Sequence, residues 1–574
     1  MKSNTFLFFI ALLIVLSLIA CSSDATKDEE PSIPQEVKTD KDLTQSEIPL
    51  PVKLMEEERL VKTIHSSDAL LVVGGKGHYK QRGMNEFDYN GIDVHNTEEY
   101  DRIYENDFKR VLDNPLSTFS IDVDAASYGN VRRFINSNKL PPADAVRIEE
   151  LINYFDYDYP QPEDDDPFSI VAEVSSCPWN RENKLIHIGI QGKEISTQNL
   201  PPSNLVFLID VSGSMRSPNK LPLLKKAFKL LVTQLRPEDK ISMTVYASAS
   251  GVVLPSTNGS QKEKIVEALN RLEAGGSTAG SEGIKLAYKV AKENFIEGAN
   301  NRVILATDGD FNVGPSSDSE LVRLIEEKRK EGIFLTVLGF GMGNYKDSKM
   351  EKLADKGNGN YAYIDNILEA KKVLVNEFGG TLFTIAKDVK LQIEFNPAKV
   401  KGYRLIGYEN RLLNKEDFND DTKDAGELGS GHTVTALYEI IPPNVEYNFP
   451  SVDELKYQTD NNKIENNTNE LLTVKFRYKK PNEDKSKLIS RTLLDESTEF
   501  DETGNNFRFS SSVAMFGMLL RDSKFKGSSS YNYALSIANN ALGIDKFGYR
   551  KEFLRIVEKA KLLTEVDGLS MSGE

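Results

Sequence analysis

The stretch LVFLIDVSGSM, from Leu205 to Met215, decides the fold of this chain. Its first half is a run of apolar residues, which is typical of a strand buried on both faces of a parallel sheet covered by helices. The strand ends at Asp210, and a glycine between two serines, Ser212 and Ser214, follows at once. One carboxylate and two hydroxyls therefore gather on a tight turn that the glycine allows. Oxygen-only ligands suit Mg²⁺, Mn²⁺ or Ca²⁺ and disfavour zinc or copper, which prefer nitrogen and sulfur.

Two later stretches carry side chains of the same kind. Taken alone, the turn after Asp210 is also an ordinary way to leave a strand and cap a helix. However, GGSTAGSEG places Thr278 in a glycine-rich loop, and RVILATDGDFN places Asp308 just after another apolar strand, Val303 to Ala306. Together the three loops supply five oxygen side chains, which favours a metal centre over a helix cap.

This constellation resembles the metal-ion-dependent adhesion site of von Willebrand factor type A domains. Asp210, Ser212 and Ser214 match the D-x-S-x-S element, Thr278 matches the lone threonine, and Asp308 matches the aspartate of the T-D-G element. The resemblance implies an α/β fold: a doubly wound, mostly parallel, Rossmann-like sheet with a divalent ion at the carboxyl ends of its strands. We expect Mg²⁺ first, with Mn²⁺ or Ca²⁺ as alternatives.

The first 21 residues are typical of a targeting segment. Lys2 precedes an apolar run from Phe6 to Leu16, and Leu18-Ile19-Ala20-Cys21 closes the segment. This ending resembles the lipobox of bacterial lipoproteins, which implies a signal peptide cleaved before Cys21 and lipid on that cysteine. A membrane-spanning helix fits less well because the run is short of ~20 residues. We therefore expect a lipid anchor in the bacterial outer membrane, with the protein facing either the periplasm or the outside.

Length, charge and cysteine content set further bounds. A chain of 574 residues is too long for one hydrophobic core, so several compact units are expected. A net charge of −16 repels phosphate backbones, so nucleic acid is not an expected partner. With lipid on Cys21, the thiol of Cys177 is the only one left, and no intramolecular disulfide can form.

Composition and periodicity divide the chain into segments. We predict a signal peptide at 1–21, a flexible polar tether at 22–60, a poorly defined segment at 61–113, an N-terminal flanking region of helices and then strands at 114–201, the α/β domain at 202–384, a β-rich C-terminal domain at 385–500 and a helical segment at 501–574.

Alternating apolar residues predict antiparallel strands on both sides of the α/β domain. FSIVAEVSS and KLIHIGIQG lie between Phe168 and Ile195, and further alternating runs begin at Val389, Gly431 and Leu472. Nothing comparable precedes Phe168. We predict that the two sets of strands form one β-sandwich interrupted by the α/β domain, each sheet being buried on one face only.

The flanking regions carry a second resemblance. NPLSTFSIDVDAASYGNVRRFI, LPPADAVRIEELINYFDYDYP and, downstream, GHTVTALYEI are similar to the YfbK-like family of bacterial von Willebrand factor type A lipoproteins. Within these stretches, Asp122 and Asp124 form a second metal site or, as we prefer, surface or capping carboxylates. Asp144 fits the N-cap of a helix, and Trp179 fits a packed corner residue.

Two functions from different classes remain open. The first is a binding module, in which the ion captures a Glu or Asp carboxylate of a partner protein. The second is a metal-dependent enzyme or enzyme subunit, in which the ion orients a substrate. Hydrolysis needs a positioned base or nucleophile, and the metal loops contain none beyond Glu282, which fits a helix N-terminus better. The sequence also lacks H-E-x-x-H, G-x-S-x-G and P-loop motifs, so a non-enzymatic binding role is favoured.

Overall fold

The computed structural model describes residues 97–121, 124–163, 166–196, 200–278, 280–309, 311, 318–377, 383–450, 468–481 and 483–571. Three sequence-based predictions therefore lie outside the described residues: the signal peptide at 1–21 with its lipidated Cys21, the tether at 22–60 and the role of Asp122.

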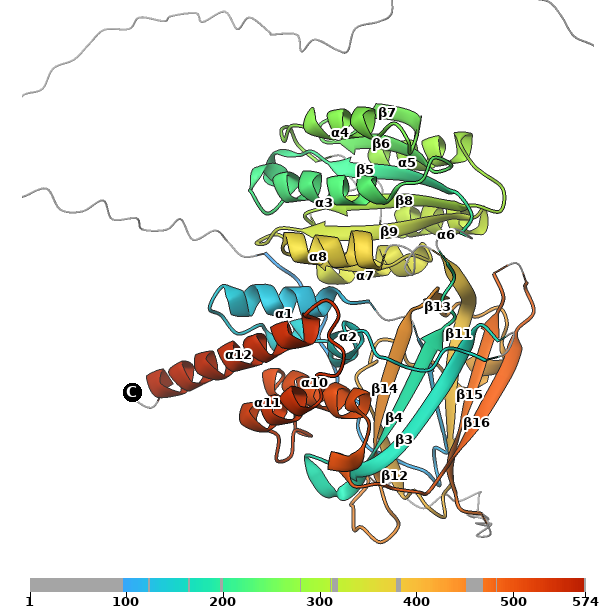
Figure 1. The fold of residues 1–574 in the computed structure, drawn as a ribbon, viewed down its shortest axis with the longest axis vertical. Helices are drawn as coiled ribbons and strands as arrows, with labels where there is room; N and C mark the ends of the chain where they lie inside the picture. Colours follow the sequence, from blue (N-terminus) through green and yellow to red (C-terminus); the bar gives the residue numbers. More distant parts are fainter. Residues whose placement is uncertain are drawn as a thin grey trace, which may run out of the picture. The chain divides into compact units, whose positions relative to one another are not determined.

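A six-stranded sheet forms the centre of the α/β domain, in the order β10-β9-β8-β5-β6-β7 (Figure 1). All neighbouring strands are parallel except β7, which runs antiparallel to β6 at the edge. The strands are β5 (Ser203–Asp210), β6 (Lys240–Tyr246), β7 (Ser250–Asn258), β8 (Asn300–Thr307), β9 (Ile333–Phe340) and β10 (Tyr361–Ile364).

Helices cover both faces of this sheet, which confirms the predicted doubly wound fold. Leu205 and Phe207 of β5 pack toward one set of helices, whereas Val206 and Leu208 pack toward the other. A strand flanked by two apolar layers must be apolar at every position, as the run before Asp210 is. The first face carries α3 (Leu221–Gln234), α4 (Lys262–Asn270) and α8 (Ile367–Lys371); the second carries α5 (Gly280–Glu293), α6 (Asp318–Lys330) and α7 (Asp347–Lys356).

Two antiparallel sheets form the predicted sandwich, and their inner faces share one hydrophobic core. Strand β4 pairs with β14 from Lys184↔Ile440 to Gln191↔Thr433, so strands before and after the α/β domain lie side by side. The insertion of that domain into a β-sandwich is therefore confirmed. One sheet has the order β1-β12-β14-β4-β3, with β1 (Lys109–Arg110), β3 (Phe168–Cys177), β4 (Asn180–Gly192), β12 (Gly402–Ile406) and β14 (Thr433–Ile441).

The second sheet corrects two expectations. It contains β11 (Thr384–Phe395), β13 (Gly426–Gly429), β15 (Glu470–Lys479), β16 (Lys487–Leu494) and β2 (Leu116–Ser120). Strand β2 pairs with β11 although it precedes Phe168, where no strand was expected. The face of β11 away from the core is also covered: Lys390 and Gln392 are buried because the 3₁₀ turn η5 (Lys415–Asn419) and the chain after it accept hydrogen bonds from both.

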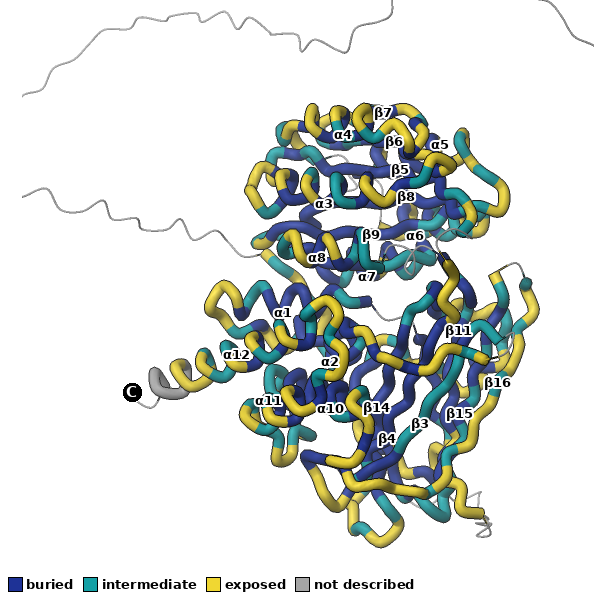
Figure 2. Tube along the Cα trace, in the orientation of Figure 1, coloured by how far each residue is buried: buried dark blue, intermediate teal, exposed yellow. Residues whose placement is uncertain are grey.

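A layer of helices covers the outer face of the first sheet (Figure 2). It consists of α1 (Ala126–Asn136), α2 (Ile148–Asn153), α10 (Asn505–Leu520), α11 (Tyr531–Asn540) and α12 (Tyr549–Met571). Phe553, Ile556 and Val557, from the segment 501–574 that was predicted to be helical, lie within this core. Trp179 is a buried residue in the β3–β4 turn, as predicted, and its indole N–H donates to Glu439 at 3.1 Å.

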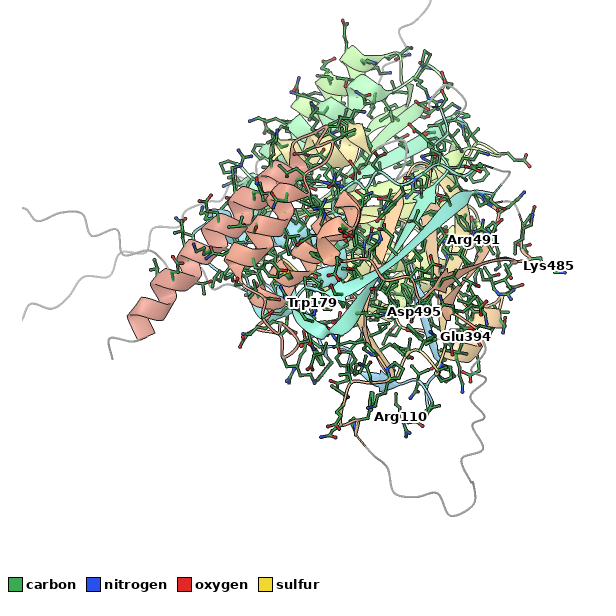
Figure 3. The ribbon with its side chains drawn as sticks, turned by 60° about the horizontal axis from the view of Figure 1, so that its bottom comes forward. Arg110, Trp179, Glu394, Lys485, Arg491 and Asp495 are labelled. Atoms are coloured by element: carbon green, nitrogen blue, oxygen red, sulfur yellow. The ribbon has the colours of Figure 1, made fainter. Side chains whose placement is uncertain are left out.

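The opposite side of the sandwich is polar. Figure 3 shows Glu394 of β11 among the exposed charged residues of the second sheet, which include Arg491 of the edge strand β16 and Lys485 in the turn before it. Glu394 pairs there with Lys475 of the neighbouring strand. Across the part of the chain that the structure describes, no helix has the length and hydropathy needed to cross a bilayer.

Two acidic residues of the flanking region have roles that the sequence did not indicate. Asp124 is neither exposed nor a cap: it is 4% exposed, accepts a hydrogen bond from the backbone N–H of Tyr361 and pairs with Arg411 at 3.2 Å. Asp144 does not cap α2, because its carboxylate accepts from the N–H of Ile103 instead. Asp122 lies outside the described residues.

Candidate metal centre

Two aspartates meet at the point where the strand order of the α/β sheet reverses. Asp210 ends β5 and Asp308 follows β8, and these strands are direct neighbours, with Ile209 opposite Ala306. The chain leaves β5 toward β6 on one side and returns to β8 on the other, so this is the crevice where open α/β sheets bind ligands. Both carboxylates are fully buried.

The turn after Asp210 brings the two serine hydroxyls together. The carboxylate of Asp210 accepts the backbone N–H of Ser212 at 2.8 Å, and the Oγ atoms of Ser212 and Ser214 are 3.0 Å apart. Gly213 donates its N–H to the carbonyl of Gly276 at 2.9 Å, at an approach that leaves little room for a side chain. Ser214 is exposed, so the site opens to solvent at the hydroxyls.

The glycine-rich loop brings Thr278 to the same edge of the sheet. Gly275 donates its N–H to the carbonyl of Val211 at 2.8 Å, which lays the loop along the turn after β5. Gly276 has φ +82°, and a Cβ there would lie 2.4 Å from the hydroxyl of Ser248. Thr278 follows two residues later, half-buried, and its hydroxyl makes no hydrogen bond to another residue that the structure describes.

Asp308 is held by a lysine that the sequence reasoning missed. The ammonium of Lys220 lies 2.8 Å from Oδ2 of Asp308, and the amide of Asn344 donates to the same oxygen at 3.1 Å. Burial raises the pKa of Asp308, but the charge and hydrogen bond of Lys220, with hydrogen bonds from Ser214 and Asn344, outweigh it and leave the pKa below its usual value. The only sequence signal for Lys220 was its position ten residues after Asp210.

Among the residues that the structure describes, Asp210 has no cationic partner of this kind. Its Oδ2 accepts from the hydroxyl of Tyr246 at 3.0 Å and from that of Thr307 at 3.3 Å. Burial is the largest influence and raises the pKa of Asp210 to about 6, with the nearby charge of Asp308 acting in the same direction and the hydrogen bonds from Ser212 and Tyr246 opposing it. A buried carboxylate that is costly to ionise would gain from a bound cation.

The donor set suits a hard divalent cation. Four of the five predicted ligands, Asp210, Ser212, Ser214 and Asp308, are linked through hydrogen bonds, and Thr278 lies on the adjoining loop. Within the described ranges no group of three or more His, Cys, Asp or Glu side chains is placed to hold a metal. This site has only two carboxylates, and hydroxyls would complete the oxygen ligation that Mg²⁺ prefers.

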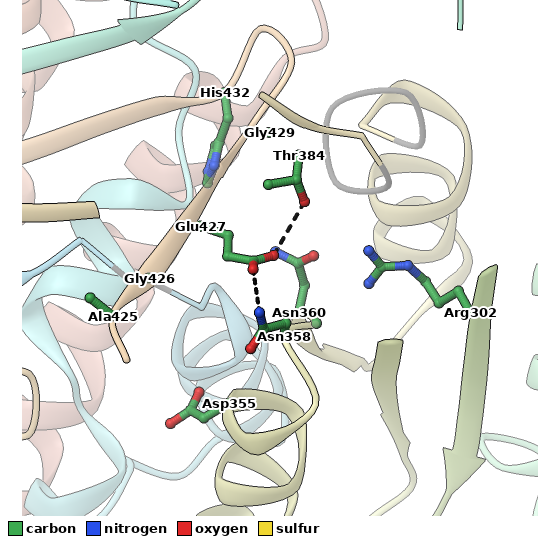
Figure 4. Close-up of a pocket in the computed structure, with 11 residues that line it drawn as sticks. Arg302, Asp355, Asn358, Asn360, Thr384, Ala425, Gly426, Glu427, Gly429 and His432 are labelled. Carbon is green, nitrogen blue, oxygen red and sulfur yellow. Dashed lines mark hydrogen bonds between the residues drawn. The ribbon is translucent and has the colours of Figure 1, made fainter. Parts of the chain in front are cut away.

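One cleft lies next to this site, and one small cavity lies far from it. A cleft of about 510 Å³ opens beside Gly309, which directly follows Asp308, and Val322 of α6 and Lys349 of α7 line it. A second cavity, of about 30 Å³, is lined by Arg302 at the opposite end of β8 and by Glu427, which accepts hydrogen bonds from Asn358 and Thr384 (Figure 4). That volume suits a single water molecule, and the cavity is remote from Asp210 and Asp308.

Comparison with known proteins agrees with the fold. The family model described as von Willebrand factor type A domain matches residues 204–375, the model described as von Willebrand factor matches 94–187, and the model described as Uncharacterized protein YfbK, C-terminal, matches 380–563. A von Willebrand factor type A domain indicates a role in protein interaction or adhesion.

Individual relatives differ in how much of the chain they cover. Inter-alpha-trypsin inhibitor heavy chain H4 of Homo sapiens is 29% identical over 161 residues, which are 27% of this chain and 17% of that protein. The solved structure of von Willebrand factor type A from Catenulispora acidiphila covers 67% of this chain and 89% of its own, at 16% identity and a TM-score of 0.37. The protein YfbK of Escherichia coli (strain K12) is 43% identical over 478 residues, 82% of each chain. This chain therefore belongs to the YfbK family of bacterial von Willebrand factor type A proteins.

Proposed function

We propose that this protein is a membrane-anchored lipoprotein that binds a partner protein through a divalent ion held by Asp210, Ser212, Ser214, Thr278 and Asp308. Mg²⁺ is the first choice, with Mn²⁺ and Ca²⁺ as alternatives, because all five side chains are oxygen donors. The observation that carries this proposal is the meeting of Asp210 and Asp308 at the strand-order reversal, with the Ser212 and Ser214 hydroxyls 3.0 Å apart above them.

The site favours an anionic partner group. Its two carboxylates supply a charge of −2, and Lys220 offsets one of these charges at Asp308. A divalent cation there would keep net positive charge, and a Glu or Asp carboxylate of a partner is its natural complement. The exposed Ser214 marks where such a group would enter, and the cleft beside Gly309 gives room for neighbouring residues of the partner.

The first experiment tests the metal and the partner together. Asp210→Asn keeps the size of the side chain: its amide oxygen can still accept from the N–H of Ser212, and its NH2 group can donate to the hydroxyl of Tyr246, so the fold should survive. We expect it to abolish Mg²⁺ binding in isothermal titration and to lose the proteins that cross-link to the wild-type chain in membranes in a chelator-sensitive manner. Asp239→Asn is a matched control: this aspartate is also buried in the domain, but it accepts from Ser203 at the other end of the sheet.

Unchanged Mg²⁺ binding and cross-linking by a folded Asp210→Asn protein would contradict the proposal. The enzyme alternative predicts a different result, namely a small product released from membrane extracts in a Mg²⁺-dependent manner by the wild type and not by the variant. The cleft beside Gly309 is the feature that such a substrate would occupy.

The anchor requires a separate test, because Cys21 lies outside the described residues. If Cys21 carries lipid, Cys21→Ser should leave a heavier precursor that incorporates no labelled fatty acid. Cys177→Ser is the control, since Cys177 is the other cysteine and is buried in the core. Normal processing of Cys21→Ser would refute the anchor and leave the metal proposal standing.

A further inference from the structure

Lys220 is a buried cation inside the candidate metal centre. The residue is only 6% exposed and lies between the turn η3 (Gly213–Arg216) and helix α3. Its ammonium donates to Oδ2 of Asp308 at 2.8 Å and to Oδ1 of Asn344 at 3.0 Å. A lysine is rarely buried unless it is paired, so this position is held by Asp308.

The fold makes a slot for this side chain. Gly341, directly after β9, has φ +86°, and a Cβ there would lie 2.3–2.8 Å from three carbons of the Lys220 stem. The carbonyl of Gly341 accepts a hydrogen bond from the hydroxyl of Tyr363, which fixes the backbone along the slot. The lysine stem therefore fits only because residue 341 lacks a side chain.

The loop that follows Gly341 is itself fixed. Glu98 accepts the N–H of Gly343 at 2.8 Å and forms a two-pronged ion pair with Arg133, with donor–acceptor distances of 3.1 and 2.9 Å. Asn344 is the next residue of this loop, and its amide contacts both Lys220 and Asp308. The arrangement around the ammonium is thus held by elements outside the metal loops as well.

We infer that Lys220 is a positioning residue that sets the charge of the metal centre and so makes its cation depend on an outside carboxylate. This inference rests on the proposed function. Lys220 neutralises Asp308 and competes with a metal ion for its carboxylate, so Asp210 is left as the one uncompensated charge of the five predicted ligands. Metal binding alone is weakened, and metal and partner carboxylate bind cooperatively, each raising the affinity for the other.

If Lys220 contributes only to stability, a different result is expected for its variants. Lys220 and Asp308 would then form an ordinary buried ion pair, and its loss would destabilise the fold without tightening metal binding. The two roles are separated by measuring Mg²⁺ affinity and unfolding free energy on the same variants.

The experiment is a titration of the full chain in detergent with Mg²⁺, in equal ionic strengths of sodium chloride and sodium acetate. Lys220→Met and Lys220→Gln remove the charge, and Gln keeps a hydrogen-bond donor so that a folded neutral variant is available. Lys220→Arg keeps the charge, and Asn344→Ala removes the neighbouring donor without changing the charge.

We expect Lys220→Met and Lys220→Gln to bind Mg²⁺ alone at least about ten-fold more tightly than the wild type, because a like charge has been removed from beside the site. The gain in Mg²⁺ affinity that acetate gives the wild type should shrink in both, and Lys220→Arg and Asn344→Ala should keep the wild-type pattern. Unchanged or weaker Mg²⁺ binding by a folded neutral variant overturns the inference alone. Absence of Mg²⁺ binding in every protein, wild type included, overturns the proposed function with it.

Discussion

Replacing Arg132 with methionine should destabilise the protein by about 3–5 kcal/mol, the usual cost of removing one partner from a buried ion pair. The guanidinium is 1% exposed and donates to Asp365 and Glu369 of the α/β domain, at distances of 2.5 to 2.9 Å. It also donates to Tyr154 at 2.9 Å and to Glu552 of α12 at 3.1 Å. Methionine would leave two nearly unexposed carboxylates without their cation, whereas Glu552 can turn to solvent and should add less.

The assay is urea unfolding followed by tryptophan fluorescence and circular dichroism. Trp179 is the only tryptophan and lies in the same core as α1 and α12, so its emission reports the layer that Arg132 joins to the α/β domain. Arg271→Met is the control: its pair with Glu267 is largely exposed, and the change should stay within about 0.5 kcal/mol. A loss below about 1 kcal/mol for Arg132→Met would refute the reasoning that this cluster ties the α/β domain to the helical layer.

Two further outcomes follow from the structure. Mg²⁺ at 100 times its dissociation constant should stabilise the protein by about 2.7 kcal/mol in thermal or urea unfolding, a shift that EDTA reverses and that Asp210→Asn lacks; an equal shift in Asp210→Asn would place the ion elsewhere. Burial lowers the pKa of His187 to about 3, whereas histidine in the unfolded chain has a pKa near 6.5. As the pH falls, the unfolded chain therefore binds a proton at this residue before the folded chain does. Stability should therefore fall as pH drops from about 6.5 to about 3, by up to about 5 kcal/mol from this group, and His187→Phe should flatten that part of the acid-unfolding profile.

The parts of the fold that could be predicted are those that depend on residues adjacent in the sequence. The apolar run before Asp210 must be buried on both faces, and the residues Ser212 and Ser214 themselves indicate the turn that follows it. Alternation along β4 and β14 was also sufficient to predict one sandwich, because a strand with one apolar face needs a partner sheet. Four of the five candidate ligands could be placed together on the same grounds, since parallel strands end at one edge.

The features that could not be predicted depend on contacts between distant segments. Asp124 resembles a surface carboxylate until Arg411, almost three hundred residues away, is brought against it. Lys390 lies on the polar face of a strand in which apolar and polar residues alternate. The turn η5 and the residue after it nevertheless cover Lys390 and accept its hydrogen bonds. A short strand such as β2 has too few residues to show a period, and only its pairing with β11 defines it.

Lys220 shows why a motif predicts the ligands of a metal site but not the net charge around them. The motif fixes which oxygens gather, because Asp210, Ser212 and Ser214 lie within five residues. The charge of the site depends on what else is packed there, and the slot at Gly341 admits a lysine stem from another part of the chain. A site with the same five oxygens and no such lysine would hold its cation with two free carboxylates and have less need of a third. In this protein, the electrostatic demand for a partner carboxylate therefore arises outside the motif, at the contact between Lys220 and Asp308.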